Sequence, residues 1–253
     1  MTDTHIVIPA RMASTRLPGK PLLDIGGKPM IQHVWERARE SAVGDVTIAT
    51  DDVRIADAAA AFGADCMLTG EDHRSGTDRI AEVAAARQWR DVNIVNVQGD
   101  EPFIPPAAIR QVSDLLQHHS QAQLATLAAP LQEAGAFEDP NCVKLVTDQN
   151  GFALYFSRAP IPFPREQPAA QSSQAQIGAR RHVGIYGYRL DALQQMVAAP
   201  PCALEIAESL EQLRALWLGL RIVVADAVST PAAGIDTAQD LANARRIATA
   251  SAR

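Results

Sequence analysis

The alternation of short apolar, β-branched runs with amphipathic segments is the feature of this 253-residue sequence that most limits its possible folds. Short runs of apolar residues, and alternation of apolar with polar residues, predict strands at residues 5–8, 46–50, 66–68, 93–97, 125–129 and 143–147. A single apolar face predicts helices at residues 29–41, 53–62, 77–88 and 105–118. Because such alternation is typical of βαβ units, we expect an α/β fold with a mostly parallel sheet and helices on both faces.

The pattern changes after about residue 150. Residues 155–164 are extended and proline-rich, and residues 165–181 are rich in Gln, Ser and Ala without periodicity, which predicts a mobile loop. The remaining expected elements are a strand at 184–189, helices at 191–197 and 204–218, a strand at 221–225 and a helix at 238–249. We therefore expect a single domain, with a core from residues 1–150 and 219–253 and a smaller inserted lobe from residues 151–218.

The loop after the first expected strand is basic, although the chain as a whole is acidic. It reads PARMASTRLPGKPL, residues 9–22, and carries Arg11, Arg16 and Lys20 without an acid. Backbone N–H groups of a small-residue loop can approach an anion while the side-chain cations neutralise it. The loop is therefore either a phosphate cradle or an ordinary solvated surface loop.

Two carboxylates stand at other expected strand ends, where open parallel sheets bind their ligands. Asp100 follows a buried strand in the turn QGDEP, and Asp236 precedes the last helix. Asp236 has a second interpretation as an acid that favours a helix start. Together with the basic loop, the two residues predict metal-assisted phosphoryl or nucleotidyl transfer, since Mg²⁺ binds one or two carboxylates plus phosphate oxygens.

Composition argues against several other classes of protein. The formal net charge of −6 disfavours non-specific nucleic-acid binding. The apolar runs are too short for membrane insertion, and the first residues lack the pattern of a signal peptide. Three scattered cysteines without CxxC spacing predict neither a disulfide framework nor a zinc site and fit the cytoplasm. The sequence has no GxxxxGK[ST], GxGxxG, GxSxG or HExxH motif at a suitable place.

Several blocks of sequence resemble the 3-deoxy-manno-octulosonate (Kdo) cytidylyltransferase family. They are IPARMASTRLPGKPL, DHRSGTDRIAEV, NVQGDEP, ALYFSRAPIP, RHVGIYGYR, LEQLRAL and GIDT, in this order along nearly the whole chain. The first block is shared with related cytidylyltransferases, including those acting on sialic acid, whereas RHVGIYGYR and LEQLR favour Kdo. Two departures stand out, because Arg74 replaces the usual Gln and residues 165–181 match nothing that can be aligned.

This resemblance implies a homodimeric enzyme with a Rossmann-like nucleotidyltransferase sheet. It would use CTP and Mg²⁺ to convert Kdo into CMP-Kdo and pyrophosphate for lipopolysaccharide biosynthesis. Residues 1–150 and 219–253 would form the nucleotide-binding core, and residues 151–218 the sugar-binding and dimerisation lobe. The extended, apolar residues 155–163 also favour a dimer, since an edge of that kind is usually covered.

The resemblance also assigns roles to individual residues. The catalytic set would be Arg11, Lys20, Asp100 and Asp236, with Lys20 on the departing pyrophosphate and the two acids on the metal. Nucleotide binding would use Ala10, Arg11, Ser14, Thr15, Arg16, Lys20, Arg74, Ser75, Gly76, Arg79 and Asp100. Sugar binding would use Gln98, Arg158, His182, Tyr186, Glu211 and Gln212, with Arg for a carboxylate and amides and Glu for hydroxyls.

Some of these residues have plainer interpretations. Thr77 is equally well explained as part of a helix cap. Tyr186 fits ordinary sheet packing, and Glu211 fits an exposed salt bridge. Two further functions also stay open: a cytidylyltransferase for sialic acid or 8-amino-Kdo, and a non-catalytic nucleotide-sensing protein. Asp100 and Asp236 argue against the last, because a pure binder needs no pair of metal carboxylates.

Overall fold

A computed structural model describes residues 2–13, 17–131, 135–165, 178–229 and 234–251. Within these residues, nine strands form one sheet, whose main path runs β11-β7-β10-β6-β1-β4-β5. The strands are β1 (Thr4–Ala10), β4 (Val46–Thr50), β5 (Asp65–Leu68), β6 (Asn93–Asn96), β7 (Leu124–Pro130), β8 (Lys144–Thr147), β9 (Ala153–Ser157), β10 (Arg180–Arg189) and β11 (Ile222–Asp226). The helices are α1 (Met30–Glu40), α2 (Val53–Ala61), α3 (Gly76–Ala86), α4 (Pro106–His118), α5 (Leu190–Ala198), α6 (Ala203–Glu208), α7 (Gln212–Trp217) and α8 (Ala238–Ser251).

The direction of the strands confirms the expected mostly parallel α/β sheet. β1 pairs in parallel with β4 and β6, β4 with β5, and β7 with β11. The antiparallel pairs are those of β10, which lies between β6 and β7, and those that join β8 to β10 and to β9. The parallel strands β1, β4 and β6 therefore end at the same edge of the sheet, where the candidate site lies.

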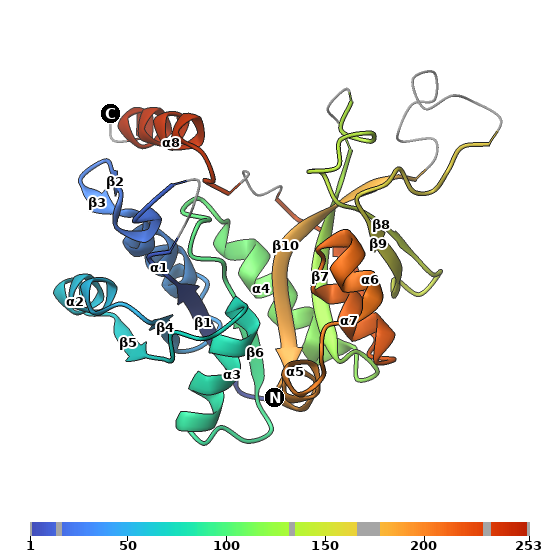
Figure 1. Cartoon of the computed structure of the whole chain (residues 1–253), viewed down its shortest axis with the longest axis horizontal. Helices are drawn as coiled ribbons and strands as arrows, with labels where there is room; N and C mark the ends of the chain where they lie inside the picture. The colour runs from blue at the N-terminus through green and yellow to red at the C-terminus, as the bar shows by residue number, and fades with distance from the viewer. Residues whose placement is uncertain (1, 14–16, 132–134, 166–177, 230–233, 252–253) are drawn as a thin grey trace.

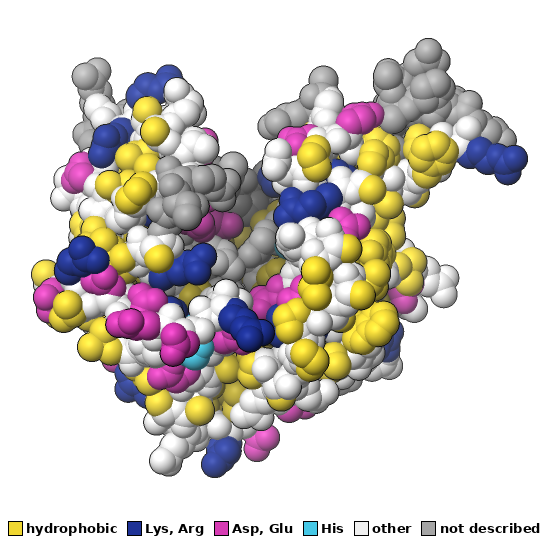
Figure 2. Space-filling model, in the orientation of Figure 1, with side chains coloured by type: hydrophobic (Ala, Val, Ile, Leu, Met, Phe, Trp, Pro, Cys, Tyr) yellow, Lys and Arg dark blue, Asp and Glu magenta, His cyan; other side chains and the backbone are white. Residues whose placement is uncertain are grey.

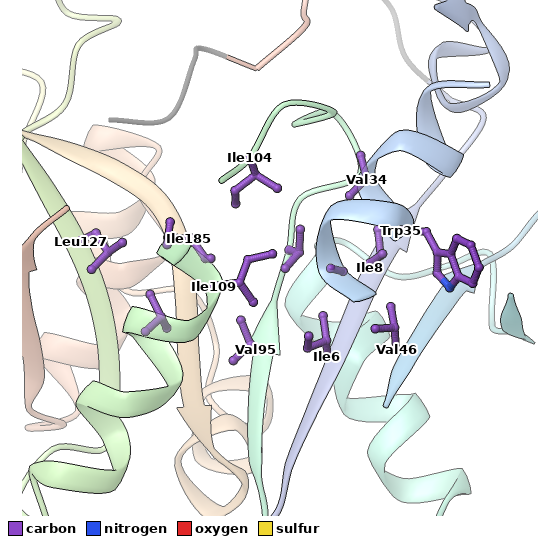
Figure 3. Packing of buried hydrophobic residues seen from close by; sticks show 14 of the residues in the cluster. Ile6, Ile8, Val34, Trp35, Val46, Val95, Ile104, Ile109, Leu127 and Ile185 are labelled. Atoms are coloured by element: carbon purple, nitrogen blue, oxygen red, sulfur yellow. The ribbon is translucent and has the colours of Figure 1, made fainter. Parts of the chain in front are cut away.

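Helices cover both faces of the sheet, as the amphipathic patterns predict (Figure 1). On one face, α1, α2 and α4 pack on strand residues such as Ile6, Ile8 and Val95, all fully buried (Figure 3). On the other face, α3, α5 and α7 pack on Val7 and Ile94. Because Ile6, Val7 and Ile8 alternate between the two clusters, β1 contributes to both layers of the core.

A third, smaller cluster lies outside these two layers. It joins the C-terminal helix α8 to the hairpin β2–β3 (Asp24–Ile25 and Lys28–Pro29) and to the loop before the short helix η1 (Lys20–Leu22). Figure 1 shows α8 next to this hairpin, at one end of the molecule. The sequence reasoning missed both η1 and the hairpin, although Gly26-Gly27 between two extended pairs is a hairpin signal.

Two expected elements are wrong in detail. The helix expected over residues 204–218 is broken into α6 and α7, because Ser209 takes a left-handed conformation with φ of 51°. Glu208 accepts hydrogen bonds from Ser157 and Arg158, so the chain turns there instead of continuing the helix. Arg180 and Arg181, expected in a loop, pair with β7 and β8 as the start of β10, while residues 166–177 of that loop lie outside the described residues.

The smaller lobe expected from residues 151–218 stays a prediction. One of its elements, β10, runs in the middle of the main sheet. Of the described helices, none is both long and apolar enough to cross a membrane. None of the three cysteines forms a disulfide within the described part of the chain.

Candidate active site

A cavity of about 670 Å³ opens where β1 and β6 end, and we call it the strand-end pocket. Its lining comes from four segments that are far apart in the sequence. The lining residues are Pro9, Ala10, Arg11, Ala13, Lys20, Pro21, His73, Arg74, Ser75, Gly76, Arg79, Gln98, Gly99, Asp100 and Asp236. Figure 2 shows the molecule hollowed between the side that carries α8 and the side that carries β8 and β9. The pocket therefore lies where a parallel sheet binds its ligand.

Two glycines allow these segments to approach one another. A Cβ at Gly99 would lie 2.8 Å from the carbonyl oxygen of Pro9, and one at Gly76 would lie 3.0 Å from Pro9 Cγ. Real Cβ atoms do not come so close to a backbone oxygen, so a side chain at residue 99 would separate the ends of β1 and β6. The glycines of QGDEP and DHRSGTD thus bring the turn after β6 and the start of α3 against the first loop.

Lys20 lies between the two predicted metal carboxylates. Its ammonium Nζ donates hydrogen bonds to Asp100 Oδ2 at 2.7 Å and to Asp236 Oδ1 at 2.8 Å. The Lys20 side chain is 11% exposed, whereas those of Asp100 and Asp236 are 36% and 45% exposed, so the lysine is shielded from water but the two carboxylates stay accessible from the pocket. The structure thus brings together residues 20, 100 and 236, as expected, but gives the carboxylates a partner that the sequence did not reveal. The ammonium offsets the repulsion between the two acids.

The same geometry bears on the expected metal. Two carboxylate oxygens lie within 2.8 Å of one atom, so they surround a common point. Among the described residues, no group of three or more His, Cys, Asp and Glu side chains could hold a metal ion. Mg²⁺ is commonly bound by one or two carboxylates and completes its octahedron with water and phosphate oxygens. The residues present therefore fit Mg²⁺ delivered with a triphosphate.

The predicted nucleotide residues fall into three groups. Ala10, Arg11, Arg74, Ser75 and Gly76 line the strand-end pocket. Ser75 also caps α3, because its Oγ accepts a hydrogen bond from the N–H of Asp78 at 3.2 Å. Ser14, Thr15 and Arg16 lie outside the described residues.

Arg79 lines the pocket but is largely occupied by protein groups. It is 3% exposed, and its guanidinium donates to Asp51 Oδ2 at 2.6 Å and to the backbone oxygen of Gly70 at 3.3 Å. Thr69 Oγ1 is a third acceptor. Arg79 therefore fixes the end of β5 on α3, and its contact with a nucleotide stays a prediction.

Of the predicted sugar residues, the structure places Gln98 in the strand-end pocket and Glu211 in a neighbouring cavity. That cavity, of about 990 Å³, shares His73, Arg74 and Ser75 with the strand-end pocket. Glu211 Oε2 accepts a hydrogen bond from Thr77 at 2.5 Å, which ties the start of α7 to α3. The capped helix start expected at residues 75–77 is confirmed with Ser75 as the cap, and the Thr77 hydroxyl in the first turn donates to Glu211.

His182 and Tyr186 lie on β10 and do not line the strand-end pocket. Tyr186 is buried and His182 is half-buried, and their rings contact each other with centroids 5.2 Å apart. His182 Nε2 is 3.0 Å from Thr126 Oγ1 on β7, and its ring also contacts Phe156 on β9. Gln212, in the first turn of α7, is buried as well.

Arg158 stands at the end of β9, and protein groups hold its position. Its guanidinium donates to the backbone oxygens of Glu208 and Pro140 at 2.6 and 2.8 Å, and its backbone oxygen accepts from the fully buried Lys144 at 2.6 Å. The structure does not place Arg158 in the strand-end pocket. Its expected contact with a sugar carboxylate stays a prediction.

The sequence reasoning missed Glu101, which directly follows Asp100. Burial, reinforced by the charge of Asp100, raises the pKa of the Glu101 carboxyl to about 7. Its Oε2 atom is buried and has no hydrogen-bond partner within the described residues. The QGDEP block contained the signal, since it sets two acids side by side at the end of a buried strand.

The burial of His182 predicts a pH effect on stability. Burial, and then the charge of Arg181, lower the pKa of His182 to about 3 from 6.5. Between pH 6.5 and about pH 3, His182 is protonated in the unfolded chain but neutral in the folded protein. The free energy of unfolding therefore decreases as the pH falls through this range. The slope is at most about 1.4 kcal/mol per pH unit. Urea unfolding at pH 7, 6 and 5 should show a weaker pH dependence for His182→Gln than for the wild type, and equal slopes would contradict this prediction.

Comparison with known proteins identifies the family of this chain. The family model described as Cytidylyltransferase matches residues 5–222. A 3-deoxy-manno-octulosonate cytidylyltransferase of Pseudomonas fluorescens is 56% identical over 245 residues, which are 96% of each chain. A protein of the same name from Pseudomonas syringae pv. syringae is 55% identical over the same share.

Solved structures give the same result. A CMP:2-keto-3-deoxy-manno-octonic acid synthetase in complex with CTP matches 99% of this chain and 100% of its own, with 43% identity and a TM-score of 0.90. A 4-diphosphocytidyl-2C-methyl-D-erythritol synthase, 15% identical with a TM-score of 0.63 over 98% of both chains, shares the fold alone. The chain therefore belongs to the cytidylyltransferase family, among the 3-deoxy-manno-octulosonate cytidylyltransferases.

Proposed function

We propose that this protein transfers the cytidylyl group of CTP to 3-deoxy-manno-octulosonate, releasing pyrophosphate and supplying the activated sugar for lipopolysaccharide synthesis. The observation that carries the proposal is the convergence of Lys20, Asp100 and Asp236 in the strand-end pocket. The names and CTP complex of the similar proteins support the same nucleotide and sugar. The scattered cysteines support a cytoplasmic location.

The reaction is an in-line displacement at the α-phosphorus of CTP. The anomeric hydroxyl of the sugar loses its proton to solvent, and its oxygen forms the new bond to the α-phosphorus. The bond from the α-phosphorus to the bridging oxygen of the β-phosphate breaks, and pyrophosphate leaves with that electron pair. Such a transfer needs positioning and charge neutralisation more than covalent help from the protein. Mg²⁺, when bound by Asp100 and Asp236, would neutralise phosphate charge and polarise the α-phosphate.

The Lys20 ammonium can pair either with the two carboxylates or with the phosphates of the nucleotide. In the free protein its ammonium pairs with Asp100 and Asp236. To stabilise the departing pyrophosphate, the ammonium has to turn from these carboxylates to the phosphates, which leaves the carboxylates available for the metal. The four-carbon stem of a lysine allows this exchange. Arg11 and Arg74, which line the same pocket, add positive charge for the triphosphate.

A release assay tests this function. We expect pyrophosphate release from CTP with 3-deoxy-manno-octulosonate in the presence of Mg²⁺. A preference for sialic acid or 8-amino-Kdo in the same panel would select the alternative sugar. Absence of release with every acidic sugar would contradict an enzymatic role and leave nucleotide sensing.

The proposal includes a homodimer, because a group of apolar side chains is exposed on one side of the molecule. Leu154 of β9, Ile206 of α6 and Trp217 of α7 are 62%, 68% and 63% exposed, and Phe163 is 80% exposed. Figure 2 shows hydrophobic side chains gathered over α6 and α7. This apolar face includes part of the 155–163 segment expected at a dimer interface. Large exposed apolar patches commonly mark protein–protein contacts.

A charge on this face should separate the subunits. We expect wild-type protein to sediment as a dimer at micromolar concentration and Ile206→Asp to sediment as a monomer, because an unpaired buried charge is strongly unfavourable at an interface. Val53→Asp is the matched control, since Val53 is 59% exposed on α2, in the layer on the opposite face of the sheet. A monomeric wild type, or a dimeric Ile206→Asp protein, would contradict the dimer.

A further inference from the structure

The segment that carries Asp236 is attached to the site by its backbone. The N–H of Ile235 donates to the backbone oxygen of Asp100 at 2.9 Å, so one hydrogen bond joins the two carboxylate-bearing segments directly. Gly234 also lies against Asp100, because a Cβ there would be 3.6 Å from the same oxygen. The position of Asp236 is therefore defined relative to Asp100 and not only relative to its own helix.

Asp240 fixes the other side of Asp236. Its Oδ2 atom accepts hydrogen bonds from the N–H of Asp236 at 3.1 Å and from the N–H and Oγ1 of Thr237, both at 2.8 Å. The two N–H groups are backbone donors at the start of α8 that the helix itself cannot satisfy, and the third donor is the Thr237 hydroxyl. One carboxylate oxygen thus holds both the residue that carries the metal ligand and the residue after it.

Ile235 anchors the segment that carries Asp236 in the third, smaller hydrophobic cluster. It is 3% exposed and packs with Leu17 of the first loop, Ile25 of the hairpin and Leu241 of α8. The middle of α8 is attached to the same hairpin, since Arg245 Nε donates to the backbone oxygen of Asp24 at 2.9 Å. We call residues 234–251 with the hairpin β2–β3 the C-terminal clasp.

We propose that Asp240 and Ile235 are positioning residues of the active site, which hold the Asp236 carboxylate opposite Asp100 and around Lys20. Asp100 belongs to the turn after the central strand β6, whereas Asp236 belongs to the clasp, whose described contacts place it in the site. The distance between the two carboxylates therefore depends on the clasp. The use of the site for Mg²⁺ rests on the proposed function. The placement of the Asp236 carboxylate around Lys20 does not depend on that function.

The first test needs neither metal nor substrate. The lysines of the sequence are Lys20, Lys28 and Lys144, which differ in exposure: the Lys20 side chain is 11% exposed, that of Lys28 is 45% exposed, and Lys144 is fully buried. An amine-reactive reagent followed by peptide mass spectrometry reports each of them. The labelling of exposed Lys28 serves as the internal reference for the amount of reagent. Buried Lys144 should be labelled only if the protein unfolds.

We expect Asp240→Ala to raise the labelling of Lys20 relative to Lys28 about fivefold, the factor that corresponds to a lost helix-cap interaction. Asp240→Asn keeps one acceptor oxygen and should stay close to wild type. The matched control is Asp191→Ala, which removes the first-turn acid of α5, where Asp191 accepts from the N–H of Ala192 at 2.8 Å. Equal Lys20 labelling in Asp240→Ala and Asp191→Ala would overturn the proposal.

Ile235→Val provides a second variant if Asp240→Ala labels Lys144 and is therefore unfolded. Removing one methyl group keeps the core but loosens the anchor, so Lys20 labelling should still rise above that of the wild type. Unchanged labelling in this folded variant would equally overturn the proposal.

The second test measures the metal site. Titration of the isolated protein with Mn²⁺, with the free ion followed by electron paramagnetic resonance, should give about tenfold weaker binding for Asp240→Ala than for Asp191→Ala. If the wild type binds no Mn²⁺ even with CTP, the metal part of the proposed function fails, whereas the labelling result still decides the role of the clasp. Equal Mn²⁺ affinity in the two variants would overturn the link between the clasp and the metal.

Discussion

Asp100→Asn and Asp236→Asn should each lower kcat at least about a hundredfold, because each removes one of the two carboxylates available for the metal. The amide keeps the size of the side chain and can still accept a hydrogen bond from Lys20, so the fold should be preserved. The measurement is the steady-state rate of pyrophosphate release over a range of Mg²⁺ concentrations. Asp226→Asn is the matched control, since Asp226 ends the parallel strand β11 and pairs with Arg180, and it should keep the wild-type rate.

The double variant should be hardly slower than either single variant. Groups that act as one unit are strongly non-additive, because the first loss already disables the site. If the two losses multiply, the carboxylates act independently and do not share a metal. Near-normal Mg²⁺-dependent turnover in Asp236→Asn would contradict a metal-binding role, and Asp236 would then serve only as an acid that favours a helix start.

The stability of these variants follows from Lys20. Two neighbouring carboxylates considered alone predict that an Asn at either position stabilises the metal-free protein by relieving repulsion. The structure removes that reason, since the Lys20 ammonium lies 2.7 and 2.8 Å from the two acids. Each substitution then exchanges an ion pair for a weaker hydrogen bond, and we expect the Tm without metal to fall slightly or stay equal.

Most of the fold could be predicted because its signals are local. The β-branched run 46–50 became β4 without a change of boundary, and the apolar face of α1 is the face that is buried. The break between α6 and α7 could not be predicted, because it depends on Glu208 reaching Ser157 and Arg158 about fifty residues away in the chain. The helical periodicity of the sequence continues across that break. It therefore gives no sign of the contact between Glu208 and the end of β9.

The candidate site was predictable in its composition but not in its pairings. Strand ends of a parallel sheet meet at one edge, which is why Asp100 and the first loop could be placed together from sequence. The pairings of Lys20 with the two acids, Arg79 with Asp51 and Thr77 with Glu211 each join residues that no spacing rule connects. Resemblance named most of these residues, yet it did not show which of them bind one another in the free protein.

Lys20→Ala should lower kcat by about a hundred- to a thousandfold while changing the KM for the sugar little, because its charge acts on the departing pyrophosphate in the transition state. Lys28→Ala is the matched control. Lys28 pairs with Glu36 at 2.7 Å, and its side chain is 45% exposed, so its loss should leave turnover unchanged. Equal losses in kcat and in sugar affinity would indicate that Lys20 only supports the fold.

Removal of Lys20 should also change how the protein responds to metal. Without the ammonium, Asp100 and Asp236 repel each other, so Lys20→Ala should have a lower Tm than the wild type in the presence of a chelator. Added Mg²⁺ should then raise the Tm of Lys20→Ala more than that of the wild type, in which the metal has to displace the ammonium. Arg11→Met is the comparison that isolates this effect, because Arg11 lines the same pocket, and the side-chain bonds to the two carboxylates in the described part of the chain come from Lys20. If Arg11→Met gains as much from Mg²⁺ as Lys20→Ala, the effect is one of general charge, and Lys20 does not compete with the metal for the two carboxylates.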